Sequence, residues 1–156
     1  MVNWNRAALL DACLRSLAQP QGLRFDVIVV DNGSTDASLA VIARHAATAP
    51  FPVRLIRNNE NRGFCAANNQ GMFASSAPLI ALLNNDAEVH PLWLAELAAA
   101  FTGPRVGMAA SKVLVHEDPR IIDKVGHLIY LDGQNRGRGT GEIGRASCRE
   151  RVLTDV

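Results

Sequence analysis

Apolar runs alternate with helix-like patterns along most of the chain. Residues 26–30 form a run of mainly β-branched residues without polar alternation, which is typical of a strand buried on both faces of a parallel sheet. Residues 1–5 are interpreted as the last residues of a strand, and residues 3–6 as the loop after it. The other predicted strands are residues 26–30, 53–57 and 79–84. Apolar residues at helical spacing predict helices over residues 6–18, 34–48, 64–75 and 90–102.

Several finer features accompany these elements. Ser34 or Thr35 is a suitable N-cap for the second helix. The third helix carries three amides in its body, Asn68, Asn69 and Gln70, which cost helix propensity and need partners. The buried face predicted for the fourth helix consists of Trp93, Leu94, Leu97, Ala98 and Phe101.

The later part of the chain is less regular. Residues 106–115 predict a long strand, and residues 120–132 predict a strand or a hairpin with a turn near Gly126. The Gly- and Arg-rich residues after Gly133 predict loop or disorder. The order of elements indicates a three-layer α/β domain with a mostly parallel sheet. Ligands of such sheets bind beyond the carboxyl ends of the strands, so residues 3–5, Asp31, residues 58–63 and Asp86 are expected along one edge.

Composition narrows the class of protein. A chain of 156 residues with 48% apolar and 20% charged residues fits one globular domain. A formal net charge of +1 gives no basis for nucleic-acid binding. The three cysteines, Cys13, Cys65 and Cys148, form no disulfide framework, and two of them lie on apolar helix faces as expected core residues. With no signal peptide and no apolar run of transmembrane length, we expect a cytoplasmic protein; peripheral membrane association of a full-length form stays open.

Two acids stand out as candidates for chemistry. Asp31 directly follows a buried strand, where its carboxylate can accept from the N–H of a pyrimidine ring or from a ribose hydroxyl, or can act as a turn residue in Asp-Asn-Gly-Ser-Thr-Asp. Asp86 ends the run Leu-Leu-Asn-Asn-Asp and can bind a hard divalent cation that also holds a diphosphate, or can be a solvated loop acid. Asn84 adds an amide oxygen but no charge. Glu88 and the scattered histidines are interpreted as surface or core residues.

Other chemistries lack their motifs. The sequence contains no phosphate-binding P-loop, no Gly-rich dinucleotide motif after the first strand and no nucleophile elbow. A receiver-like phosphoacceptor role for Asp31 would need an acidic pair and a later lysine that we cannot place. A sugar-phosphate nucleotidyltransferase would need a Gly-rich basic loop after the first strand, where this chain has Asn-Trp-Asn-Arg-Ala-Ala.

Six stretches occur together in order: VNWN, LLDACLRSL, DVIVVDNGSTDAS, VRLIRNNENRGFCAANNQG, LIALLNNDAEVHPLWL and IIDKVGH. Their combination resembles the family 2 glycosyltransferases, which are inverting enzymes of GT-A fold, and looks closest to their rhamnosyltransferase-like branch. The resemblance covers residues 1–139. Residues 140–156 do not resemble the family and are expected to be a disordered or foreign tail.

The resemblance implies roles for particular residues. Asp86 stands at the second Asp of the family's Asp-x-Asp and would bind Mg²⁺ or Mn²⁺ at the diphosphate, whereas Asn84 replaces the first Asp. Asp31 would contact the base or ribose. The residues implied to lie beside the nucleotide sugar are Asn3, Asn5, Asp31, Asn32, Arg62, Gly63, Asn68, Asn69 and Asn84.

The resemblance also implies partners and a mechanism. The donor would be a dTDP- or UDP-sugar, and the acceptor a glycan or lipid-linked hydroxyl in polysaccharide synthesis. The family's catalytic base lies in a later acidic motif that this sequence lacks. We therefore expect the donor-binding half of a glycosyltransferase that binds nucleotide without turnover. The alternative is a non-catalytic nucleotide-binding fragment.

Overall fold

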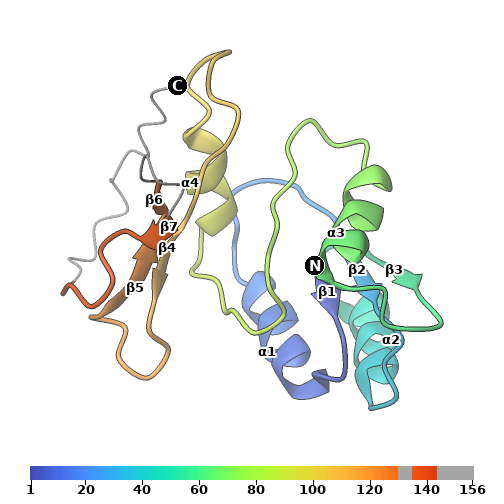
Figure 1. Ribbon diagram of the computed structural model, residues 1–156. Coiled ribbons are helices and arrows are strands. Elements are labelled where there is room, and N and C mark those ends of the chain that lie inside the picture. The colour runs from blue at the N-terminus through green and yellow to red at the C-terminus, as the bar shows by residue number, and fades with distance from the viewer. Residues whose placement is uncertain (130–134, 144–156) are drawn as a thin grey trace. The chain divides into compact units, whose positions relative to one another are not determined.

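The computed structural model describes residues 1–129 and 135–143 (Figure 1). It divides into two compact units, residues 1–95 and 96–156. Each unit is described by itself below. The end of the predicted strand or hairpin at 120–132, Cys148 and most of the predicted tail lie outside the described residues.

The first unit is built on three parallel strands, β1 (Val2–Asn3), β2 (Val27–Asp31) and β3 (Val53–Arg57). Their order in the sheet is β1-β2-β3. The register aligns Asn3 with Asp31 and Asp31 with Arg57. The three strands therefore end at the same level, which places their following loops at one edge of the sheet, as predicted.

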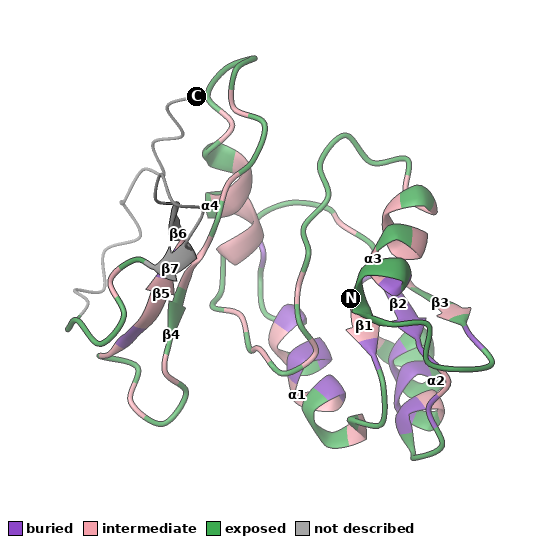
Figure 2. Cartoon of the chain, viewed as in Figure 1, coloured by how far each residue is buried: buried purple, intermediate pink, exposed green. Residues whose placement is uncertain are grey.

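Helices cover both faces of this sheet. Helix α1 (Ala7–Leu17) and helix α2 (Ser38–Thr48) pack on one face, where Leu10, Leu14 and Ile42 form a core with Val27 and Val29 of β2. Helix α3 (Phe64–Phe73) packs on the other face, because Gly71 lies against Val30, whose side chain alternates with that of Val29. The buried residues concentrate along α1, β2 and α2 (Figure 2). The predicted three-layer α/β arrangement is confirmed.

The predicted N-cap of α2 is wrong. The residue at the cap is Ala37, which makes no side-chain capping bond. Instead, Asp36 Oδ1 accepts from the Ser38 N–H at 2.9 Å, and its Oδ2 accepts from the Ala7 N–H at 2.9 Å. One carboxylate thus accepts hydrogen bonds at the amino ends of both α1 and α2. Because Asp36 takes this role, α2 begins at Ser38, later than it would with Ser34 or Thr35 as its N-cap.

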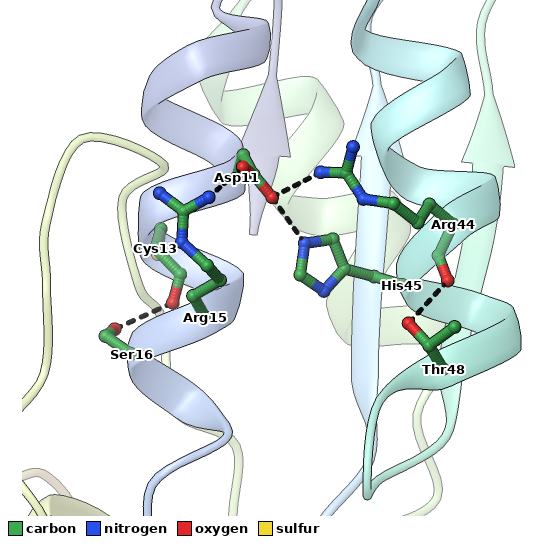
Figure 3. Close-up of polar contacts among 7 residues, drawn as sticks. All are labelled: Asp11, Cys13, Arg15, Ser16, Arg44, His45 and Thr48. Carbon is green, nitrogen blue, oxygen red and sulfur yellow. Dashed lines mark hydrogen bonds and ion pairs between the residues drawn. The ribbon is translucent and has the colours of Figure 1, made fainter.

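A polar cluster joins α1 to α2 (Figure 3). Asp11 Oδ1 lies 2.7 Å from His45 Nε2 and 2.6 Å from Arg44 Nη2, and Asp11 also pairs with Arg15. Burial alone would raise the pKa of Asp11, but hydrogen bonds from His45 and Arg44 outweigh it and hold that pKa below its ordinary value. The cluster therefore ties the two helices together while Asp11 is ionised.

The predicted strand over residues 79–84 is wrong. This segment is irregular, and Leu79, Ile80 and Leu82 are exposed. A strand here would need a ladder along β1, and β1 spans only two residues. The segment is held by its end instead, where Leu83 and Val89 pack against the core and the Val89 N–H donates to Ser16 Oγ at 3.0 Å.

Two expectations about buried side chains also need correction. Cys13 is buried as predicted, but Cys65 is exposed because it lies on the outer side of α3. Helix α4 (Trp93–Ala99) begins later than predicted, and none of its residues is fully buried. Trp93, from the predicted apolar face, packs on the first unit's core.

The second unit contains short antiparallel pairs. Strand β4 (Lys112–Leu114) pairs with β5 (Ile122–Val125), and β6 (His127–Ile129) pairs with β7 (Asn135–Gly137). The long strand predicted over 106–115 is therefore reduced to three residues. The turn near Gly126 exists, with φ +71°, but β5 and β6 pair with other strands rather than with each other. The predicted loop after Gly133 is wrong for β7.

Candidate nucleotide-sugar site

One buried amide organises the edge where the strands end. Asn3, fully buried, donates from Nδ2 to Asp31 Oδ1 at 3.1 Å and to Ser34 Oγ at 3.2 Å. Its Oδ1 accepts from Asn85 Nδ2 at 2.8 Å. Because Asn3 and Asp31 are register partners, the sheet itself brings them together. A single side chain thus connects the end of β1, the turn after β2 and the segment that carries Asp86.

Asp31 lies behind the surface of the site. Its side chain is fully buried, with Oδ1 accepting from Asn3 and Oδ2 accepting from the Ser34 N–H at 3.0 Å. This is the turn-forming arrangement that the sequence left open as an alternative. Each carboxylate oxygen can accept more than one hydrogen bond, so the predicted contact with base or ribose stays a prediction.

The loop after β1 is shaped by Asn5. Its φ of +51° is unusual for a residue with a side chain. The conformation is held by bonds in both directions: the Asn5 N–H donates to Ser34 Oγ at 3.0 Å, and Asn5 Oδ1 accepts from the Thr35 N–H at 2.7 Å. Asn5 therefore connects the loop after β1 to the loop after β2. The residues on either side of it, Trp4 and Arg6, are exposed.

A second amide network fixes the loop after β3. Asn32 Oδ1 accepts from Asn58 Nδ2 at 2.9 Å and from the Arg62 N–H at 3.1 Å, and Asn32 Nδ2 donates to Asn61 Oδ1 at 2.7 Å. Asn58 and Gln70 exchange two bonds of 2.8 and 3.0 Å. Gln70, one of the three amides of α3, therefore has the side chain of Asn58 as its partner.

These loops surround a cavity of about 280 Å³. Residues from four segments line it: Val2, Trp4, Arg6, Asn32, Asn61, Phe64, Asn84, Asn85 and Asp86. Trp4 and Phe64 are 51% and 62% exposed, so the wall offers two open aromatic surfaces. Asp86 and Asn84 are exposed, whereas Asn85 is half-buried through its bond to Asn3. The cavity combines aromatic, amide and charged groups.

The predicted residues divide into three groups. Asn32, Asn84 and Asp86 line the cavity. Asn3, Asn5 and Asp31 support its wall from behind. Of the remainder, Arg62 and Gly63 contact the wall only through their backbone, Asn68 donates to the Phe64 carbonyl within its own helix, and Asn69 is exposed.

Four lining residues lie outside the residues and ranges predicted for this edge: Val2, Arg6, Phe64 and Asn85. Trp4 and Asn61 lie inside the predicted ranges 3–5 and 58–63, but neither was named as a site residue. Trp4 and Arg6 flank predicted site residues in Asn-Trp-Asn-Arg, where an aromatic side chain among polar neighbours is itself a surface signal. The sequence gives no reason to choose Asn85 over Asn84, because the two are adjacent asparagines. The structure distinguishes them, because Asn85 is bonded to Asn3.

The wall that carries Asp86 contains an inert thiol. Cys13 Sγ donates to the Asn84 carbonyl oxygen at 3.4 Å. Burial, with the carboxylates of Asp86 and Glu88 adding to it, raises the pKa of the Cys13 thiol to about 12. The thiol is therefore protonated at neutral pH and acts as a hydrogen-bond donor rather than a nucleophile.

A divalent cation would find few protein ligands here. In the described part of the chain, no three side chains of His, Cys, Asp or Glu come together as a metal site. Asp86 supplies one carboxylate and Asn84 one amide oxygen at the same wall. That donor set suits Mg²⁺ or Mn²⁺ when the remaining ligands are substrate phosphates and water.

None of the helices in residues 1–129 and 135–143 has the length and apolar composition that crossing a bilayer requires.

Comparison with known proteins agrees with the geometry. The chain is 34% identical over 148 residues to succinoglycan biosynthesis protein ExoU of Rhizobium meliloti, covering 85% of this chain and 42% of ExoU. It is 31% identical over 113 residues to glycosyltransferase AglE of Haloferax volcanii, covering 70% of this chain and 36% of AglE.

A solved structure matches as well. The mannosyltransferase PcManGT of Pyrobaculum calidifontis, in complex with GDP-Man and Mn²⁺, superposes with a TM-score of 0.64 at 28% identity over 75% of this chain and 35% of that one. This chain thus spans well under half the length of each of these relatives. The fold is that of the GT-A glycosyltransferases. Residues 1–148 match the family described as Glycosyl transferase family 2, and the chain belongs to that family.

Proposed function

We propose that this chain forms the donor-binding half of an inverting glycosyltransferase of the rhamnosyltransferase-like branch, and that its cavity holds a nucleotide-diphosphate sugar. One observation carries the proposal. Asp86 lies on the cavity wall, and its neighbour Asn85 is bonded to Asn3, the residue that also binds Asp31 at the end of β2. The position predicted for metal and diphosphate is therefore tied directly to the position predicted for the nucleoside.

The roles follow from this arrangement. The aromatic faces of Trp4 and Phe64 give the base or sugar an apolar surface, and the exposed amide of Asn61 gives it a hydrogen-bonding group. Mg²⁺ or Mn²⁺ would be held by Asp86 and Asn84 and, when bound, would stabilise the charge of the departing diphosphate. The presence of Mn²⁺ and GDP-Man in the related PcManGT complex supports this class of ligand.

We assign deprotonation of the acceptor to residues outside this chain. Inverting transfer needs a carboxylate base that deprotonates the acceptor hydroxyl, and we assign that base to a later acidic motif of a longer parent protein. The acceptor is proposed to be a glycan or a lipid-linked sugar, in keeping with the name of the relative ExoU. By itself, the 156-residue chain is expected to bind donor without transferring sugar.

The test is a titration of UDP-, dTDP- and GDP-sugars with and without Mn²⁺. Trp4 in the cavity wall provides a fluorescence signal, and Trp4→Phe shows whether that signal comes from the site, since Trp93 packs on the core. Asp86→Asn should weaken Mn²⁺-dependent binding by about tenfold or more. Glu88→Gln, which removes a neighbouring exposed carboxylate, is the matched control and should change little.

Two outcomes would count against the proposal. Failure of all three nucleotide sugars to bind would refute the donor site. Sugar transfer by the isolated chain, lost in Asp86→Asn, would refute the assignment of the catalytic base to another part of a longer protein.

A further inference from the structure

The cavity contains one cation whose charge has no partner within the protein. Arg6 and Asp86 are the two charged residues among those that line it. The Arg6 side chain is exposed, and in residues 1–129 and 135–143 it makes neither a hydrogen bond nor an ion pair. Arg15, in the helix that begins after Arg6, is paired with Asp11. Arg6 therefore differs from its neighbour in having its full hydrogen-bonding capacity open to the cavity.

The backbone at Arg6 is firmly placed. Asn5, in its unusual conformation, is bonded to Ser34 and Thr35 on the preceding side. On the following side, the Arg6 carbonyl accepts from the Leu10 N–H at 2.9 Å, and Leu10 is fully buried in the core. The guanidinium is thus carried on a fixed base at the cavity wall, while its side chain stays free to adjust.

Charge balance indicates what Arg6 can bind. A nucleotide sugar carries two formal negative charges on its diphosphate. A divalent cation adds two positive charges, and Asp86 adds one negative charge. One negative charge is left over, and the unpaired guanidinium is the group in the cavity that can balance it. The planar fork of an arginine also matches two phosphate oxygens at once.

We propose that Arg6 binds the diphosphate of the donor in the cavity that it lines together with Asp86, so that binding depends only partly on the metal. This rests on the proposed donor site and adds a residue to it. Because Asn84 is uncharged, the cation is held by a single carboxylate, and the arginine supplies positive charge to the diphosphate that does not depend on the cation being bound.

The experiment is calorimetric titration of the full chain in Mn²⁺ and in EDTA. The probes are UDP, dTDP and GDP, the corresponding nucleosides, and inorganic pyrophosphate. The variants are Arg6→Gln and Arg6→Lys, with Arg24→Gln as the matched control, since Arg24 is also exposed but does not line the cavity. Thermal melting confirms that each variant is folded, which is expected because the capping contact of Arg6 uses its backbone.

Arg6→Gln should lower the affinity for the tightest nucleoside diphosphate by about tenfold or more and leave its nucleoside within about twofold. Arg6→Lys should fall between wild type and Arg6→Gln, and Arg24→Gln should match wild type. The relative loss in Arg6→Gln should be larger in EDTA than in Mn²⁺.

Unchanged diphosphate affinity in Arg6→Gln, or an equal loss for nucleoside and diphosphate, would overturn the inference while leaving the donor site intact. Arg6-dependent pyrophosphate binding without nucleotide binding would do the reverse: the anion contact would stand and the proposed donor function would fall. If neither nucleotides nor pyrophosphate bind to wild type, both are wrong.

Discussion

Replacing Asn3 with aspartate tests how the site is held together. The substitution keeps the shape of the side chain but replaces the Nδ2 donor with an acceptor. The Asn85 bond to Oδ1 survives, and the Ser34 hydroxyl can turn to donate instead of accept. The contact with Asp31 Oδ1 at 3.1 Å cannot survive, because two carboxylate oxygens would face each other in a fully buried position.

Two effects determine how much Asn3→Asp lowers the free energy of unfolding. Loss of a buried hydrogen bond to a charged group costs about 1.5–3 kcal/mol. Repulsion between the carboxylates raises the pKa of the pair, and each unit of that rise costs about 1.4 kcal/mol at neutral pH. We therefore expect Asn3→Asp to lower the free energy of unfolding by about 3–5 kcal/mol near pH 7, a large share of the stability of a small domain.

The pH dependence makes the reasoning specific. An acid whose folded-state pKa is raised destabilises the protein increasingly as pH rises from its unfolded pKa, about 4, to its folded pKa. The loss of unfolding free energy caused by Asn3→Asp should therefore be smaller at about pH 5 than at about pH 8. Urea unfolding followed by circular dichroism at both values measures it. Asn69→Asp, which makes the same chemical change at an exposed site, is the control. A defect below about 1 kcal/mol, or one equal at both pH values, would contradict this account of the Asn3–Asp31 contact.

Two further substitutions test the surrounding framework. Asp11→Asn should lower the free energy of unfolding by about 1–2 kcal/mol near pH 7, because the bond to largely buried His45 is weakened and the exposed arginine pairs contribute little. Since the pKa of Asp11 is lowered in the folded protein, this stabilisation exists above about pH 4 and is lost as pH falls through the lower folded value, so urea midpoints of variant and wild type should converge in acid. Gly33→Ala should cost at least about 2 kcal/mol, because φ is +81° and the new Cβ would lie 2.9 Å from the Glu60 backbone. Gly71→Ala, in helix α3 with its nearest contact at 3.4 Å, should be within about 1 kcal/mol of wild type, and an equal loss in both glycine variants would argue against the steric explanation.

The parts of the fold that could be predicted are those where local pattern and long-range pairing agree. The run of residues 26–30 could only be a buried strand, and Leu10, Leu14 and Leu17 specified the face of α1. The apolar residues 79–82 gave a similar pattern, but in the described part of the chain they pair with no strand. Periodicity reports burial preference and does not report whether a hydrogen-bonding partner is present.

The site was predictable in part for a related reason. Asp31, which ends β2, could be placed at this edge from topology alone. Asp86 was placed there as the end of a strand that the structure does not contain, although it does line the cavity. The difference between a supporting and a lining residue depends on strand register, which sequence does not supply. Register pairs Asn3 with Asp31 and turns both inward. Trp4 and Arg6, which follow Asn3 in the chain, are among the residues that line the cavity.

The irregular segment before Asp86 has a consequence for how the site opens. In the part of the chain that the structure describes, the backbone N–H groups of residues 79–83 donate no hydrogen bonds. Their protons should therefore exchange with solvent rapidly, at a rate set by local opening and not by global unfolding. The wall is anchored just beyond them by the bonds from Asn85 to Asn3 and from Val89 to Ser16. Asp86 lies between these two bonds, so residues 79–83 can open locally while the carboxylate keeps its place in the cavity wall.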